Sequence, residues 1–315
     1  MKSFTLKYRL IAMASALLMA LTAVAREDKS AARVEAEAVV SPQQVYQGEC
    51  FNYTVELICD NPNIGNISRL TRIDRSGLSL VTRLDTSHRP YTDEKGNYVV
   101  EIISEIYEAG HTGKIEIPGG RYRVDFLVPT TVYDPFWGYV CTNERISREV
   151  TVPSVSVKCK ALPKAPDGFS GAVGSFEFDC ENPDVYGSPG GEIQLIYTVE
   201  GEGLLSDVKA PEMSKSLPTG LKLKSITPYE QAYLKEGKVY SQTQFLCVVT
   251  AAEAGEYEIS SVPFVYFNPD SKKYITVKSA ACRVTVGEKR RKEATPQGQY
   301  VLNLNQTDQP PILSD

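Results

Sequence analysis

The stretch EAGEYEIS at residues 253–260, together with its shorter echo HTGKIEI at 111–117, decides the fold of this chain. In both stretches a glycine is followed by apolar residues that alternate with charged ones. Successive side chains of a β-strand point to opposite faces of the sheet, so this alternation predicts a strand with one buried and one solvated face. The repeated phrase therefore predicts two copies of one β-domain.

The spacing of the glycines supports this duplication. Gly113 lies 65 residues after Gly48, and Gly255 lies 64 residues after Gly191. We expect the late glycine of each copy to be needed for a positive φ or for a close backbone approach. Each copy then ends in a predicted closing strand, REVTVPSVSV at 148–157 in the first and ACRVTV at 281–286 in the second.

Two longer alternating runs, FNYTVEL at 51–57 and EIQLIYTVE at 192–200, predict strands that each bury one face. The residues expected on the buried faces are Phe51, Tyr53, Val55, Leu57, Ile193, Leu195, Tyr197 and Val199. Short segments rich in Gly, Pro and Asn separate such strands, which is typical of antiparallel sandwiches. The predicted fold class is all-β, with two tandem Ig-like antiparallel β-sandwich domains after a cleaved signal peptide.

The first 25 residues have the pattern of an export signal. A positively charged start is followed by an uncharged apolar run at 10–25 and by small residues before the predicted cleavage after Ala25. An uncleaved anchor is the alternative, but the run is short for a membrane span. We therefore expect a periplasmic protein. The predicted divisions are a signal peptide at 1–25, a first sandwich at 26–159, a Pro-containing linker at 160–171, a second sandwich at 172–287 and a flexible tail at 288–315.

The net charge indicates which partners are disfavoured, and the cysteine content indicates whether disulfides form. The formal net charge is −5, and it becomes about −8 when three basic residues leave with the signal, which argues against nucleic-acid binding. Seven cysteines follow, without a C-x-x-C motif. Because the number is odd, at least one thiol stays free or pairs between chains. We expect buried free cysteines that fill the cores as small apolar residues.

Catalytic patterns are missing from the sequence. Its two histidines, His88 and His111, lie in turn-like segments outside any recognisable metal-ligand or nucleophile motif. We therefore expect no enzymatic activity, no cofactor and no metal site. An enzyme would need acidic side chains from both domains to meet in a cleft across the linker.

The segment YDPFWGY at 133–139 is the strongest candidate for a binding site. It could form an aromatic loop tip that becomes buried in a partner, because aromatic residues dominate interface energies. It could equally fold back onto the end of the sandwich. Its position in a late loop disfavours an antibody-type domain, in which tryptophan lies between two bridged cysteines. The candidate contact residues are Tyr133, Phe136, Trp137 and Tyr139.

Three further segments resemble one family of exported proteins. They are ALPKAPDGFSGAVGSFEFD at 161–179, GEGLLSDVKAPEM at 201–213 and AGEYEISSVPFVYFNPDSKKYITVKS at 254–279. Together they resemble the BatD family, the "oxygen tolerance" proteins encoded beside von Willebrand factor A proteins and a MoxR-type ATPase. The resemblance covers most of 31–287, and Asp134, Pro135 and Phe136 match an aromatic loop of the family.

The resemblance implies tandem Ig-like domains and a non-enzymatic scaffold that binds envelope proteins, with von Willebrand factor A domain proteins as expected partners, in envelope stress or oxygen tolerance. Many relatives continue to a C-terminal transmembrane helix, and no such segment precedes Asp315. We therefore expect no direct membrane span after signal cleavage. The alternative function is a glycan-binding or adhesive module, which would need coplanar exposed rings beside polar side chains in a groove.

Overall fold

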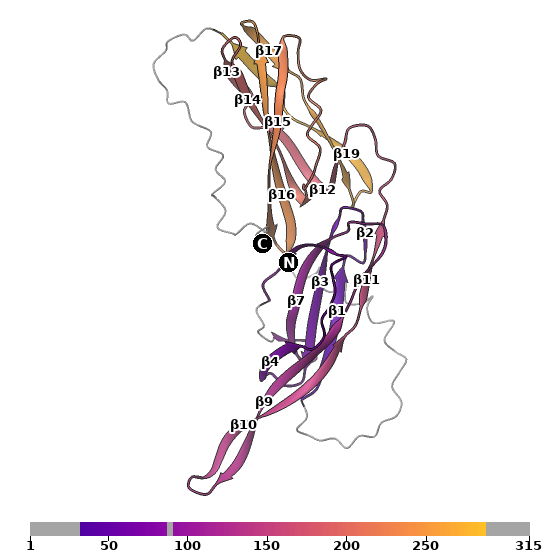
Figure 1. Cartoon of the computed structure of the whole chain (residues 1–315), viewed down its shortest axis with the longest axis vertical. Helices are drawn as coiled ribbons and strands as arrows, with labels where there is room; N and C mark the ends of the chain where they lie inside the picture. The colour runs from indigo at the N-terminus through magenta and orange to yellow at the C-terminus, as the bar shows by residue number, and fades with distance from the viewer. Residues whose placement is uncertain (1–31, 87–90, 288–315) are drawn as a thin grey trace.

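The computed structural model describes residues 32–86 and 91–287, and every regular element in these ranges is a β-strand (Figure 1). The predicted signal peptide at 1–25, the predicted tail at 288–315 and His88 lie outside the described residues. Within them, no helix has the length and hydrophobicity needed to cross a membrane. The chain forms two sandwiches arranged end to end, with a long hairpin projecting from the first (Figure 1).

The first sandwich contains β1 to β11. Its five-stranded sheet has the order β1-β3-β7-β5, with β6 pairing β7, and its other two sheets have the orders β10-β9-β4 and β2-β11-β8. The strands are β1 (Val34–Ser41), β2 (Gln44–Tyr46), β3 (Cys50–Cys59), β4 (Ile64–Arg69), β5 (Ser79–Arg83), β6 (Tyr91–Thr92), β7 (Tyr98–Glu108), β8 (Gly113–Ile117), β9 (Gly120–Asp134), β10 (Gly138–Val152) and β11 (Val155–Lys160).

The second sandwich contains β12 to β20. A six-stranded sheet of order β15-β16-β14-β12-β18-β19 packs with a three-stranded sheet of order β13-β20-β17. Each sandwich encloses its own cluster of buried residues, which confirms the predicted pair of tandem β-sandwiches. Their strand pairs are antiparallel, as predicted, apart from the parallel pairs β2–β11, β12–β18 and β13–β20. The strands are β12 (Phe169–Cys180), β13 (Asp184–Gly187), β14 (Glu192–Leu204), β15 (Leu221–Lys235), β16 (Lys238–Ala251), β17 (Gly255–Ile259), β18 (Pro263–Asn268), β19 (Lys273–Lys278) and β20 (Cys282–Val286).

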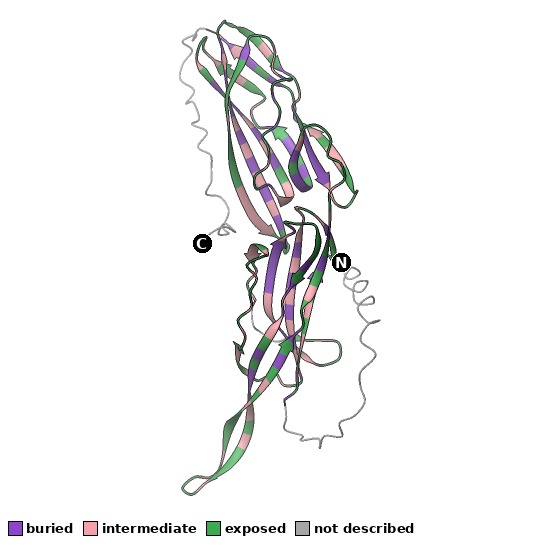
Figure 2. Ribbon diagram, turned by 45° about the vertical axis from the view of Figure 1, so that its right-hand side comes forward, coloured by how far each residue is buried: buried purple, intermediate pink, exposed green. Residues whose placement is uncertain are grey.

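The predicted buried faces are correct in both domains. Strand β3 alternates between buried and half-buried residues along its whole length, and β14 does so over its first half. All eight residues expected on these faces are buried, as Figure 2 shows by the purple bands that recur along the central strands. Each fully buried aliphatic or aromatic side chain contributes about 1.5–3 kcal/mol through removal of apolar surface from water.

The repeated phrase forms equivalent strands, β8 and β17. Strand β8 pairs antiparallel with β11, which pairs parallel with β2. In the same way β17 pairs antiparallel with β20, which pairs parallel with β13. The two three-stranded sheets therefore share one strand order and one set of directions, which confirms the duplication.

Two details of the repeat prediction are wrong. The segment 148–157 forms two strands, because β10 ends at Val152 and β11 begins at Val155 after Pro153, which has no N–H to donate to a ladder. The expected need for glycine applies at Gly113, with a φ of 106°. It does not apply at Gly255, where φ is not positive and a Cβ atom would make ordinary contacts with the Tyr257 ring.

A row of aromatic rings joins the two domains. The Tyr46 ring of the first domain meets the Phe267 ring of the second edge-on, with centroids 4.8 Å apart. Phe267 in turn contacts Tyr274, and Tyr274 contacts Phe169. Such pairs contribute about 0.5–1.5 kcal/mol each beyond the area they bury. We define these four rings as the aromatic junction.

The connecting segment, residues 161–168, is fixed by the same junction. The hydroxyl of Tyr274 donates a hydrogen bond of 2.7 Å to the carbonyl oxygen of Pro163. Gly48, with a φ of 87°, brings its backbone against the side chain of Val173 in the other domain. A side chain at Gly48 would be strained in conformation and crowded by Val173, so both domains meet at a backbone that only glycine fits easily.

Carboxylates from both domains lie near the junction. Burial raises the pKa of Glu49, and the charges of Asp270 and Glu202 raise it further, while a hydrogen bond from the Tyr46 N–H opposes the shift. Burial also raises the pKa of Glu108, with a smaller contribution from Asp207. Ionisation of these side chains therefore opposes docking of the domains at neutral pH.

We predict that Leu195→Ala, which removes a completely buried side chain of β14, lowers the free energy of unfolding by about 2–5 kcal/mol. The measurement is chemical denaturation followed by circular dichroism. The matched control is Gln194→Ala on the exposed face of the same strand, which should change the free energy by less than about 0.5 kcal/mol. Equal effects of the two variants would contradict the assigned core face.

We predict that Glu49→Gln raises Tm at about pH 7 and that its advantage over the wild type disappears as the pH falls. The folded-state pKa of Glu49 is raised, so its ionised form is destabilising above that pKa and its neutral form is not. Glutamine keeps an oxygen that can accept the Tyr46 N–H. Calorimetry from about pH 7 to about pH 4 tests this, and a pH-independent difference between the variants would contradict it.

Candidate functional site

The hairpin of β9 and β10 extends beyond the body of the first domain (Figure 1). Strand β4 pairs with β9 only from Tyr122 to Phe126, whereas β10 pairs with β9 along its full length. Residues 127–145 therefore form a two-stranded ribbon without a third strand. None of the residues in this ribbon is buried, as its green and pink colouring in Figure 2 shows.

The turn at the end of the ribbon is built by its own sequence. One carboxylate oxygen of Asp134 accepts hydrogen bonds from the backbone N–H groups of Phe136, at 2.7 Å, and Trp137, at 2.9 Å. Pro135 fixes its φ in the range that a turn needs. Gly138 has a φ of 75°, which most residues with a side chain avoid. The turn is therefore organised before any partner arrives.

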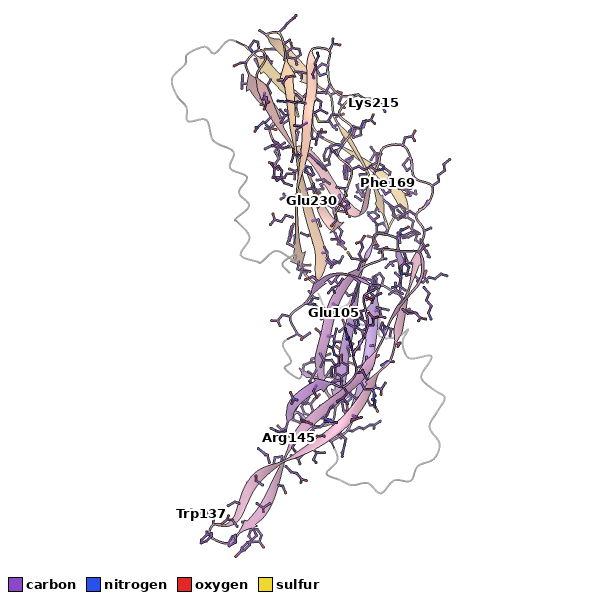
Figure 3. All side chains as sticks on the ribbon, viewed as in Figure 1. Glu105, Trp137, Arg145, Phe169, Lys215 and Glu230 are labelled. Atoms are coloured by element: carbon purple, nitrogen blue, oxygen red, sulfur yellow. The ribbon has the colours of Figure 1, made fainter. Side chains whose placement is uncertain are left out.

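Four aromatic rings are exposed at this end. Phe136 is 92% exposed and Trp137 is 82% exposed, at the farthest point of the hairpin (Figure 3). Behind them, Tyr133 and Tyr139 are cross-strand partners whose ring centroids are 5.4 Å apart at an angle of 69°. We call residues 133–139 the hairpin tip. All four predicted contact residues lie in it, and the alternative that they fold back onto the sandwich is wrong.

The hairpin tip carries little charge. Between residues 129 and 143 the single charged side chain is that of Asp134, and its carboxylate is already held by the two backbone donors. Exposed apolar area of this kind is unfavourable in water, and its burial in a complex would require removal of almost no charge from solvent. The geometry is suited to binding through ring desolvation.

The cysteines show no disulfide. All seven are free: five are buried, Cys50 is half-buried and Cys141, on the ribbon, is exposed. Burial raises the pKa of Cys50, Cys59 and Cys247 to about 12, so these thiols are poor nucleophiles. The expectation of buried free cysteines is therefore correct for five of the positions and wrong for Cys141.

Acidic side chains from both domains do approach each other at the junction, as an enzyme spanning the linker would require. Four cavities within 32–86 and 91–287 are each lined by residues of one domain, except that Asp167 and Gly168 of the connecting segment also line one of them. In the same part of the chain no group of three or more His, Cys, Asp or Glu side chains is placed to hold a metal ion.

Comparisons with known proteins give no family. No protein-family model matches the chain, and no curated protein matches it. Solved structures that match include one titled Dpr2 Ig1-Ig2 in complex with DIP-Theta Ig1-Ig3, at 8% identity and a TM-score of 0.19, covering 80% of this chain and 65% of that chain. Another is the ICAM-5 D1-D4 ectodomain fragment, at 7% identity and a TM-score of 0.15, covering 80% and 77%.

Sequence reasoning located the aromatic residues but missed the ribbon that carries them. Val128 still packs against the first core. The signal for the ribbon is the run from Pro129 to Val132, which has a threonine on each face and a proline, and so lacks the alternation of the core strands. A strand without a consistently apolar face has no face to bury, so this run extends into solvent.

We predict that Trp137, the single tryptophan of the chain, emits in the native protein at nearly the wavelength of the unfolded chain. Its indole is surrounded by water, so acrylamide should quench it almost as efficiently before as after denaturation. Steady-state fluorescence and quenching titrations measure both. Blue-shifted, protected emission from the free protein would contradict an exposed hairpin tip.

Proposed function

We propose that this chain is a non-enzymatic binding protein of the bacterial envelope and that the hairpin tip is its contact site for partner proteins. The observation that carries the proposal is the exposure of Phe136, Trp137, Tyr133 and Tyr139 at the end of one projecting ribbon. A small group of aromatic side chains usually supplies most of the binding energy of a protein interface.

The arrangement of the rings favours a protein partner over a sugar. Tyr133 and Tyr139 cross at 69°, so they do not form the flat platform on which a pyranose ring stacks. Phe136 and Trp137 lie in the turn that follows the Tyr133–Tyr139 pair and are the most exposed of the four, so they would enter a concave apolar site. Because the ribbon presents the rings away from the body, such a site could lie within a partner that the sandwiches never touch.

The envelope assignment and the BatD-type role are supported by sequence alone. The support consists of the export pattern at 1–25 and the segments at 161–179, 201–213 and 254–279. On this proposal the protein acts in the periplasm, where it holds partners such as von Willebrand factor A domain proteins and contributes to envelope stress or oxygen tolerance. Burial of the tip rings, rather than charge, provides the affinity.

We predict that Phe136→Ala/Trp137→Ala abolishes specific capture of envelope proteins without changing Tm, because both side chains are exposed and outside the cores. Loss of one central aromatic contact typically costs about 2–4 kcal/mol of binding, so the double variant should weaken binding by at least about a hundredfold. The measurement is capture from periplasmic extract with mass spectrometry, followed by titration of the captured protein.

The matched control is Tyr186→Ala/Tyr229→Ala, which removes two exposed rings from the second domain. It should capture the same proteins as the wild type. If the tip variant captures them equally well, the hairpin tip is not the contact site. Binding to a glycan array that requires the same tip residues, with no protein captured, would favour the glycan-binding alternative instead.

A further inference from the structure

The first domain contains a cavity of about 810 Å³ that the hairpin tip does not touch. It lies between β4, in the β10-β9-β4 sheet, and the end of β5 with the middle of β7, in the opposite sheet. We call it the β4–β7 groove. Its apolar lining consists of Ile64, Ile67, Leu84, Ile102, Ile103 and Tyr122.

The groove follows the exposed edge of β4. Residues 64 to 67 of β4 all line it, and β4 has a β-bulge between Ile64 and Asn66. Beyond the bulge, the consecutive residues Asn66 and Ile67 point to opposite faces of the strand. A cavity in contact with all of them must therefore run along the edge of the strand. In the described part of the chain β4 has one strand neighbour, β9, so its other edge is open for main-chain hydrogen bonds.

The opposite wall is formed by β7 and by the end of β5. At the end of β5, the Leu84 N–H donates a hydrogen bond of 2.8 Å to the Ser104 carbonyl of β7. Strand β6 pairs only with Tyr98 and Val99. A β-bulge in the pairing of β7 with β3 interrupts the ladder at Ile102, between the pairs Val55–Ile103 and Glu56–Glu101.

The groove is positively charged within an acidic protein. Three arginines line it, Arg69, Arg75 and Arg83, against one carboxylate, Glu105. The chain as a whole has a formal charge of −5, so the sign of the charge is reversed locally. Glu105 is buried and binds two of the arginines, Arg75 at 2.5 Å and Arg83 at 3.1 Å, which leaves an excess of positive charge.

The three arginines differ in how firmly they are held. The guanidinium of Arg75 lies 4.8 Å above the Tyr53 ring and donates to the Tyr53 hydroxyl, and its buried Nε–H has no hydrogen-bond partner in the described structure. Arg83 is 72% exposed, and Arg69 is exposed on the edge strand. Arg75 is thus a fixed charge inside the wall, while Arg69 and Arg83 are available to a ligand.

From these observations we propose that the β4–β7 groove binds an extended peptide segment of a partner protein by strand addition along β4, and that acidic side chains alternate with apolar ones in that segment. Main-chain hydrogen bonds would come from the open edge of β4. Apolar side chains would enter between Ile67 and Ile102. Carboxylates would pair with the arginine forks, which match carboxylate geometry.

The test uses the full chain and a fluorescein-labelled eight-residue peptide in which valine alternates with glutamate, with binding followed by fluorescence anisotropy. Arg69→Gln/Arg83→Gln should weaken binding by at least about tenfold and reduce its salt dependence, because two charge-assisted contacts are lost. Arg69 is exposed, so Arg69→Gln alone should leave Tm unchanged. Arg83 also pairs with the buried Glu105, so the double variant should have a lower Tm, and its binding is measured at a temperature well below that Tm.

Three comparisons decide the mode of binding. Arg145→Gln, at the opposite edge of the same sheet (Figure 3), should bind the peptide like the wild type. A peptide with valine alternating with glutamine should bind at least about tenfold more weakly. A Val–Glu peptide N-methylated at alternate residues cannot pair as a strand and should not bind.

Several results would overturn the proposal. No binding of the Val–Glu peptide to the wild type would end it, as would equal binding to the Arg69→Gln/Arg83→Gln variant. Undiminished binding of the N-methylated peptide would show that charge and apolar contact act without strand addition. Tighter binding of decanoate, which has a carboxylate and an apolar chain but no backbone amides, would show the same. Loss of binding in the hairpin-tip variant would place the peptide at the tip instead of in the groove.

Discussion

The constraint on which the structure depends is that every core strand must remove one of its faces from water. Strands β3 and β14 satisfy it by strict alternation, and their buried rings and aliphatic chains form the centres of the two cores. A strand segment in which apolar and polar residues no longer alternate does not pack against the opposite sheet. The β9–β10 ribbon leaves the sandwich at the point where β4 no longer covers it, so the same rule that builds the body also projects the hairpin tip.

The aromatic junction holds the two domains in contact with each other. Tyr46, Phe267, Tyr274 and Phe169 contact one another in sequence, and the Tyr274 hydroxyl holds the connecting segment. The carboxylate of Glu49 opposes these ring contacts, because its burial near Asp270 and Glu202 is unfavourable in the ionised form. The relative position of the two domains therefore reflects a balance between ring contacts and charge.

Much of the fold could be predicted from local pattern. Glycine spacing identified the repeat, and alternation identified the buried faces of β3 and β14. The aromatic residues of the hairpin tip could also be located from the sequence, because Asp134 and Gly138 form the turn within five residues; their role as contacts stays a prediction. The length of the ribbon could not be predicted, since it depends on where β4 begins, at Ile64, many residues earlier in the chain. The β4–β7 groove was missed for a similar reason: its arginines, Arg69, Arg75 and Arg83, converge only after the sheets pack.

The exposed thiol of Cys141 on the ribbon allows the native protein to be labelled chemically at one position. Of the seven cysteines, all of which lie in the described ranges, Cys141 alone is exposed, and it is two residues from Tyr139. Five of the others are buried and Cys50 is half-buried, and burial raises the pKa of Cys50, Cys59 and Cys247 to about 12. A maleimide reagent or nitroxide spin label should therefore attach at this one position in the native protein, beside the rings but outside them, without engineered mutations.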